Sequence, residues 1–285
     1  ISANGTALVA GGYSGGSGGS IYITAALISG AGTIQANGGN EGVNYGGGGG
    51  GGRIAIILTN PGSDFSGFSG ATTAYGGTYT NSNYRDGAAG TIYKQTQAQG
   101  TNNGDLIINN STRSVYTGVV TDLDGQDANL TTVGTLTVGG NAKFNIGSDD
   151  TLTIGGTGTA YVVNTGTTFV NKGTLSLVGT TFTIDGTVDF DDSGNSVIYT
   201  GRSDDSGVTL INTAYHHLTV NNSGTIFSLG AELTANGNLT VTAGTLRTDG
   251  YEIDCNGNVD SDDALNASNG NGGNTTINVA GNWDM

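Results

Sequence analysis

The sequence predicts an all-β protein, and more specifically a parallel β-solenoid (β-helix) with glycine-rich loops. Its 285 residues include 54 Gly, one Pro and only 11% charged residues, and Leu, Ala, Glu, Lys and Arg are too scarce to form long helices. Short runs alternate apolar residues with Thr, Ser or Asn, which is the period-two pattern of a strand with one buried face. Motifs also recur at a nearly constant spacing, as in repeat architectures.

Residues 1–100 contain a glycine-rich unit of roughly 35 residues. Three short strands each follow a run of small residues, at 21–23, 54–56 and 92–94, with spacings of 33 and 38. A second motif keeps the same register at residues 1–5, 34–38 and 72–76. Because this register places residue 1 inside a unit, we expect the chain to belong to a longer one. The five-residue difference between units predicts an inserted loop around residues 60–85.

Residues 101–285 form a second region, which we expect to continue the first with shorter rungs. Its alternating strands lie at residues 134–138, 151–154, 173–177, 181–184, 217–220, 238–241 and 276–279. Their spacing suits either solenoid rungs or an array of small β-sandwich domains. We favour the solenoid because the period persists while the sequence between motifs varies, and because proline is nearly absent from the strands. A narrow core built from small residues should leave little room for aromatic rings.

The glycine run at residues 46–52 occupies a fixed place in the repeat, directly before the strand at 54–56. It is not a phosphate-binding loop, because Arg53 rather than the required Lys follows it. We therefore expect a close-packed turn, a loop extruded between rungs, or backbone that packs against a neighbouring segment.

The charge of the chain argues against several partners. A net charge of −15 and a pI near 4.1 disfavour binding to nucleic acid or to anionic membrane surfaces. No stretch has the length of a membrane-spanning helix, so we expect no membrane insertion. Cys255 is the single cysteine and forms no internal disulfide. These features fit an extracellular or cell-surface protein.

The one cofactor that the sequence suggests is calcium. Asp122, Asp124 and Asp127 place three carboxylates within six residues around a glycine, a composition that hard cations favour. The order of ligands differs from that of an EF-hand, and a solvated acidic turn is the alternative interpretation.

No pattern of catalytic residues is apparent, and we expect the protein not to be an enzyme. The eight Lys and Arg residues are scattered, and no short segment combines one of them with paired carboxylates. His216 and His217 are adjacent, so on a strand their rings would point to opposite faces. No nucleophile elbow or zinc motif occurs.

Several tyrosines lie in glycine-rich segments and form the predicted contact surface: Tyr45, Tyr75, Tyr79 and Tyr84. Tyrosine beside Gly, Ser and Asn makes an adaptable surface that suits glycans or a neighbouring subunit. The alternative interpretation is that each ring covers one rung of the solenoid.

Residues 18–56, which read Gly-Gly-Ser-Ile-Tyr-Ile, then Gly-Thr-Ile-Gln-Ala-Asn-Gly-Gly, then Gly-Gly-Gly-Gly-Arg-Ile-Ala-Ile, resemble a known class of repeat. The chain is similar to the very large glycine-rich secreted or cell-surface β-helical repeat proteins of environmental bacteria. The later segments at 217–220, 236–241 and 278–283 resemble the "Asn-Leu-Thr-Val" and "Gly-Asn-Trp" rungs of the same proteins. The resemblance implies an adhesin-like or fibre-forming protein and supplies no catalytic residues.

We therefore expect an extracellular structural protein that builds a filament, sheath or surface layer through stacked β-rungs and self-association. A carbohydrate-binding adhesin stalk is the first alternative, with glycans as partners. A polysaccharide lyase or hydrolase is the less favoured alternative.

Overall fold

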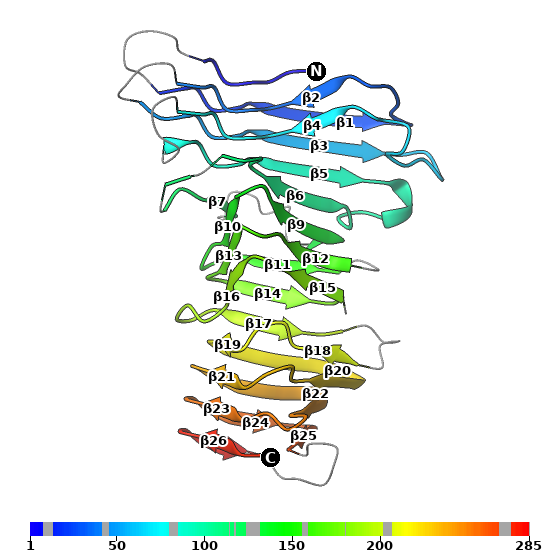
Figure 1. The fold of residues 1–285 in the computed structure, drawn as a ribbon. Coiled ribbons are helices and arrows are strands. Elements are labelled where there is room, and N and C mark those ends of the chain that lie inside the picture. The colour runs from blue at the N-terminus through cyan, green and yellow to red at the C-terminus, as the bar shows by residue number, and fades with distance from the viewer. Residues whose placement is uncertain are drawn as a thin grey trace.

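The computed structural model describes residues 1–7, 14–41, 46–79, 85–113, 115–116, 118–123, 132–155, 159–179, 181–201, 207–267 and 275–284. This part of the chain is nearly all β, and its rungs stack one below another from the N-terminus to the C-terminus (Figure 1). Among the named strands, every pairing is parallel except that of β5 with β6. The predicted parallel β-solenoid is confirmed, whereas the alternative array of β-sandwiches would require antiparallel sheets.

The N-terminal coil comprises residues 1–95. Its main sheet contains β1 (Ser20–Ala25), β3 (Arg53–Leu58) and β5 (Thr91–Gln95). Ile21 pairs with Ile54, and Ile54 pairs with Ile92, so the three isoleucines form one buried column. A short second sheet of β2 (Thr33–Gln35) and β4 (Ala71–Thr73) completes this core.

The inserted loop lies where the chain leaves β3. Ala25 pairs with Leu58, 33 residues later, but Thr33 pairs with Ala71, 38 residues later. The five extra residues therefore fall between positions 59 and 70, within the predicted range. Further along the unit the larger spacing is kept.

The glycines of the N-terminal coil form two layers of extended backbone, which we call the glycine sandwich. Layer A contains residues 3–7, 36–41 and 74–79, and layer B contains residues 14–19, 46–52 and 85–90. Backbone hydrogen bonds join the layers directly: the N–H of Gly49 donates to the carbonyl of Gly39 (3.0 Å), and the N–H of Gly39 donates to that of Gly16 (2.8 Å). None of these segments is a β-strand.

A period of three residues governs the glycine sandwich, as in polyproline II-type helices. In layer B, the N–H of Gly51 donates within its own layer to the carbonyl of Ala88 (2.9 Å). The N–H of the following Gly52 donates across the sandwich to Ala36 (2.7 Å). The third direction points outward, and there Gly50 has open space beside it.

Glycine is required wherever the two layers touch. A Cβ built on Gly49 would lie 2.0 Å from the carbonyl oxygen of Gly16, and one on Gly39 would lie 2.1 Å from that of Thr6. No side chain fits at such distances, so the backbones themselves form the packed interface. Of the three expectations for the glycine run, backbone packing against a neighbour is the one confirmed.

The strand direction reverses between the two coils. After η2 (Gln97–Gln99), β6 (Asp105–Asn109) pairs antiparallel with β5, with Ile92 opposite Ile107 and Tyr93 opposite Leu106. Ile107 packs against the N-terminal core, whereas Leu106 and Tyr93 belong to the core that follows. The two cores thus lie on opposite faces of one continuous sheet. Because strand direction and core side change together, the sense of winding is preserved.

Two buried polar side chains attach the C-terminal coil, residues 105–284, to the glycine sandwich. Asn110 accepts a hydrogen bond from the N–H of Gly76 (2.8 Å) and donates to the carbonyl of Gly87 (3.0 Å), so it caps both layers at once. The Thr121 hydroxyl donates to the carbonyl of Ala89 (2.6 Å).

The C-terminal coil has three strand positions per rung. The first is occupied by β7 (Thr121–Leu123), β10 (Lys143–Ile146), β13 (Thr168–Asn171), β16 (Thr187–Asp189), β19 (Ala214–Tyr215), β21 (Leu233–Ala235), β23 (Ile253–Cys255) and β26 (Ile277–Val279). The second is occupied by β8 (Thr132–Val133), β11 (Thr151–Ile154), β14 (Thr174–Leu177), β17 (Ser196–Tyr199), β20 (His217–Ser228), β22 (Leu239–Arg247), β24 (Val259–Ser261) and β27 (Trp283–Asp284). The third is occupied by β9 (Thr135–Gly139), β12 (Thr159–Val163), β15 (Thr181–Ile184), β18 (Val208–Thr209), β25 (Ala264–Asn266) and the ends of β20 and β22.

Each rung of this coil buries one aliphatic residue above the next. Leu152, Leu175, Val197, Leu218, Leu239 and Val259 pair in sequence along the second position, at spacings of 20 to 23 residues. All are at most 1% exposed, as the period-two pattern predicts.

Aromatic rings fill much of the C-terminal core, and the expectation of little room for rings was wrong. Phe144 stacks on Phe169 with ring centroids 5.3 Å apart, Phe169 meets Phe190 edge-on at 5.7 Å, and Tyr215 follows at 6.1 Å. Rungs with three strand positions enclose a wider interior than the flat glycine sandwich, so rings can stack there along the axis.

Two buried tyrosines at the end of this aromatic stack have hydrogen-bonded hydroxyls. The hydroxyls of Tyr199 and Tyr215 lie 2.8 Å apart and accept hydrogen bonds from the N–H groups of Ile211 and Asn212, each at 3.0 Å. Burial raises the pKa of both phenols, so they remain neutral.

Candidate functional site

The outer face of layer B contains a groove of about 650 Å³, which we call the glycine groove. It is lined by Gly47, Gly48, Gly50, Arg85, Asp86, Gly87, Ala88, Tyr116 and Val119. Its floor is bare backbone from two successive glycine segments. One wall is the segment that follows β6, which is held against layer B by a parallel bridge between Val115 and Asp86.

The side chains of the glycine groove offer one aromatic ring and one cation. Tyr116 is 61% exposed, at a turn in which the N–H of Val119 donates to its carbonyl (3.0 Å). The guanidinium of Arg85 lies 5.6 Å from the ring centroid of Tyr79. The Asp86 carboxylate is buried and accepts the N–H of Tyr79 (2.8 Å). The groove therefore combines stacking surface, backbone amides and a positive charge.

The four tyrosines of the predicted contact surface have different positions. Tyr75 lies on the outer face of layer A, half-buried beneath the guanidinium of Arg113 at 4.9 Å. Tyr79 is half-buried beside Arg85. Tyr45 and Tyr84 lie outside the described residues. The exposed Tyr116 was missed because it follows β6, where the 35-residue unit has already ended.

The predicted calcium ligands are described only in part. Asp122 is an exposed residue of β7 and pairs with Asn145 in the ladder. Asp124 and Asp127 lie outside the described residues. Across the described ranges, no group of three or more His, Cys, Asp and Glu side chains is placed to hold a metal ion.

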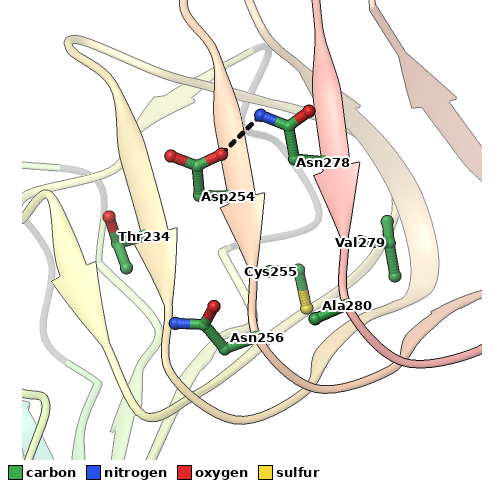
Figure 2. A pocket seen from close by; sticks show the side chains of 7 residues that line it. All are labelled: Thr234, Asp254, Cys255, Asn256, Asn278, Val279 and Ala280. Atoms are coloured by element: carbon green, nitrogen blue, oxygen red, sulfur yellow. Dashed lines mark hydrogen bonds between the residues drawn. The ribbon is translucent and has the colours of Figure 1, made fainter.

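A second, polar groove crosses β21, β23 and β26 near the C-terminal end of the coil (Figure 2). Asp254 accepts a hydrogen bond from the side-chain amide of Asn278 (2.6 Å), and Asn256 donates to Asn236 (3.2 Å). These polar groups satisfy one another along the ladder. Cys255 is buried beside them, and burial raises the pKa of its thiol, which argues against a reactive cysteine.

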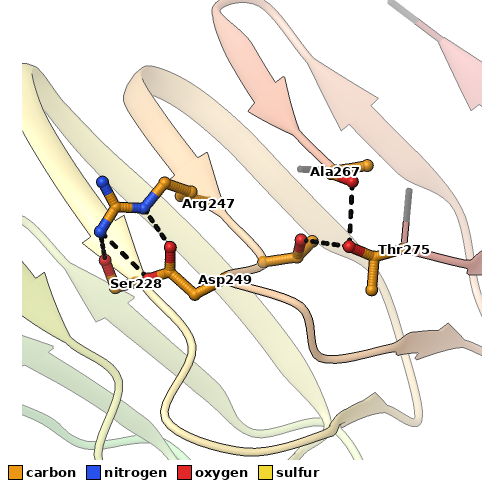
Figure 3. Close-up of polar contacts among 6 residues, drawn as sticks. Ser228, Arg247, Asp249, Ala267 and Thr275 are labelled. Atoms are coloured by element: carbon orange, nitrogen blue, oxygen red, sulfur yellow. Dashed lines mark hydrogen bonds and ion pairs between the residues drawn. The ribbon is translucent and has the colours of Figure 1, made fainter. Parts of the chain in front are cut away.

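A polar cluster near the same end joins successive rungs (Figure 3). The guanidinium of Arg247 donates to Ser228 (3.1 Å) and forms an ion pair with Asp249. The Thr275 hydroxyl donates to the carbonyl of Ala267 (2.9 Å). These contacts are structural, because each of them links neighbouring turns of the same chain.

His216 and His217 do not point apart as expected. Their ring centroids lie 4.4 Å apart with the planes at 74°. The reason is that β19 ends at Tyr215 and β20 begins at His217, so the pair occupies a corner rather than one strand. The Nδ1 atom of His217 accepts the N–H of Asn238 (3.0 Å). Burial and the neighbouring His216 lower the pKa of His217.

Charge is distributed unequally between the two regions of the sequence. Residues 1–100 contain three basic and three acidic residues, whereas residues 101–285 contain five basic and twenty acidic residues. The whole net charge of −15 therefore belongs to the second region. The surface around the glycine groove does not share this negative charge.

No protein-family model, curated protein or solved structure matches the chain.

Proposed function

We propose that the protein is a non-enzymatic extracellular structural element, which builds a filament, sheath or surface layer through stacked rungs and self-association. The observation that supports this proposal is the continuity of the hydrogen-bonded ladder. One sheet runs from β1 to β15 through both coils, and a second runs from β8 to β27. A rod built in this way gains length by adding rungs without any change in geometry.

The edges of the ladder offer a route to assembly. Val259 pairs with Trp283 of β27, which occupies the position of the buried aliphatic column but is 44% exposed. A further rung would cover this ring, whether it comes from the same polypeptide or from another copy.

An extracellular location suits this proposal, because a chain of this charge stays soluble and resists non-specific association. No helix in the described ranges is long and apolar enough to span a membrane.

Electron microscopy of the full-length native protein tests the proposal. We expect filaments, sheets or a regular layer at the cell surface. Dispersed particles in the native material, together with hydrolysis or elimination of a polysaccharide by the pure protein, would contradict it.

A carbohydrate-binding adhesin stalk is the second candidate, and the glycine groove is the observation that favours it. A polysaccharide lyase or hydrolase has less support. The three grooves among the described residues each contain a single carboxylate, from Asp86, Asp254 or Glu232, whereas glycoside hydrolysis normally needs a pair.

Calcium binding by Asp122, Asp124 and Asp127 stays a proposal. Thermal unfolding with and without a chelator tests it. We expect a lower melting temperature after chelation, and an equal melting temperature would remove calcium from the proposal.

A further inference from the structure

We propose that the glycine groove binds an acidic polysaccharide, with a sugar ring on Tyr116, a carboxylate on Arg85 and hydroxyls on the backbone amides of the floor. This inference rests on the second candidate function, because it names the site and the ligand class of an adhesin.

The floor of the groove presents backbone groups that point away from the sandwich. The N–H groups of Gly51 and Gly52 are used within layer B and across to layer A. By the three-residue period, the N–H of Gly50 takes the remaining direction, toward the groove. Ala88, which also lines the groove, lies at the equivalent place one rung further on. Amides repeated from rung to rung suit a ligand whose hydroxyls also repeat.

The walls determine the class of ligand. An exposed tyrosine ring beside polar groups is a typical platform for the apolar face of a sugar. Arg85 can hold a carboxylate through two parallel hydrogen bonds. The Asp86 carboxylate is buried and accepts the N–H of Tyr79 (2.8 Å), so it does not oppose an anion in the groove. Equal numbers of acidic and basic residues in residues 1–100 also leave an anionic polymer unrepelled there.

The shape of the surface argues against a second copy of this chain as the occupant. A two-fold contact would place the same surface against itself. Two concave grooves facing each other leave a gap, whereas a slender polymer fills one groove. The acidic C-terminal coils would also repel each other when two copies lie side by side.

Gly50→Leu is a direct test of the site. A Cβ on Gly50 meets no atom within 4 Å, and its φ is outside the positive range, so the leucine enters the groove without disturbing the sandwich. Gly32→Leu is the matched control, because Gly32 has the same open surroundings but lies outside the groove. Tyr116→Ala removes the aromatic platform, and Arg85→Gln removes the cation.

Affinity electrophoresis of the full chain in gels containing polygalacturonate or neutral dextran gives the readout. We expect polygalacturonate to retard the wild type and Gly32→Leu equally. We expect Gly50→Leu and Tyr116→Ala to weaken this binding by about ten-fold or more, and Arg85→Gln to remove the preference over dextran. Circular dichroism checks that each variant is folded.

Wild-type mobility unchanged by polygalacturonate would overturn the proposal, as would wild-type affinity in folded Gly50→Leu. Equal retardation by dextran would overturn the acidic ligand class. Sedimentation in which Gly50→Leu abolishes self-association would assign the groove to a second copy instead. Filaments seen by electron microscopy for every variant would show that the structural function stands when the groove proposal fails.

Discussion

Neighbouring glycines in this protein have opposite requirements, because the three-residue period gives each a different surrounding. Gly49 faces the carbonyl of Gly16, so a methyl group there would lie 2.0 Å from an oxygen, whereas Gly50 faces open space. We expect Gly49→Ala to destabilise the fold by about 1–3 kcal/mol or more, as overpacking does. Gly50→Ala should be neutral or stabilise by up to about 1 kcal/mol, through the entropy of the unfolded chain. Denaturant unfolding of both variants measures the difference, and equal destabilisation would refute the layered packing.

His217 should make stability depend on pH. Its lowered pKa means that the folded chain holds the ring neutral, with Nδ1 accepting the N–H of Asn238. The stabilising contribution is therefore complete above the ordinary pKa of 6.5. As the pH falls below this value, the unfolded chain binds a proton first, and stability decreases until the folded ring is protonated too. Denaturant unfolding on both sides of this pH should show a smaller decrease for His217→Gln than for the wild type. An identical pH profile in the variant would contradict this assignment.

At the scale of elements, the aromatic stack joins strands of successive rungs and should dominate the stability of the C-terminal coil. Phe169 on β13 contacts the rings of Phe144, Tyr161 and Phe190. We expect Phe169→Ala to cost about 3–5 kcal/mol, because it opens a cavity at the centre of the stack. Phe182, which is only partly buried, provides the control. Thermal unfolding that shows an equal loss for Phe182→Ala would argue against a dominant central stack.

The turns between elements explain the recurring Asn-Gly-Asn motif. The N–H of Gly257 donates to the carbonyl of Gly237 (3.0 Å), and that of Asn258 donates to the side chain of Asn238 (3.0 Å). The next rung repeats both bonds at Gly281 and Asn282. The glycine allows close backbone stacking, and the asparagine side chain continues the ladder around the corner.

For the whole molecule, the unequal charge of its two regions should control association. The C-terminal region has the entire net charge of −15, so copies that approach side by side repel each other at low ionic strength. Salt shortens the screening length from about 30 Å at 0.01 M to about 8 Å at 0.15 M. We therefore expect sedimentation velocity to show more self-association of the full chain as salt increases. Association that weakens with salt would indicate contacts between opposite charges instead.

The sequence alone was sufficient to predict the all-β class, the parallel rungs and the place of the inserted loop, because period-two burial and motif spacing are local properties. Tertiary structure decided what is not local. The reversal at β5 and β6 puts two cores on opposite faces of one sheet, and no motif announces it. The glycine groove forms because a segment beyond the repeat lies against layer B. The histidine corner and the aromatic stack depend on where strands end and how wide a rung is, and both follow from packing between residues far apart in the chain.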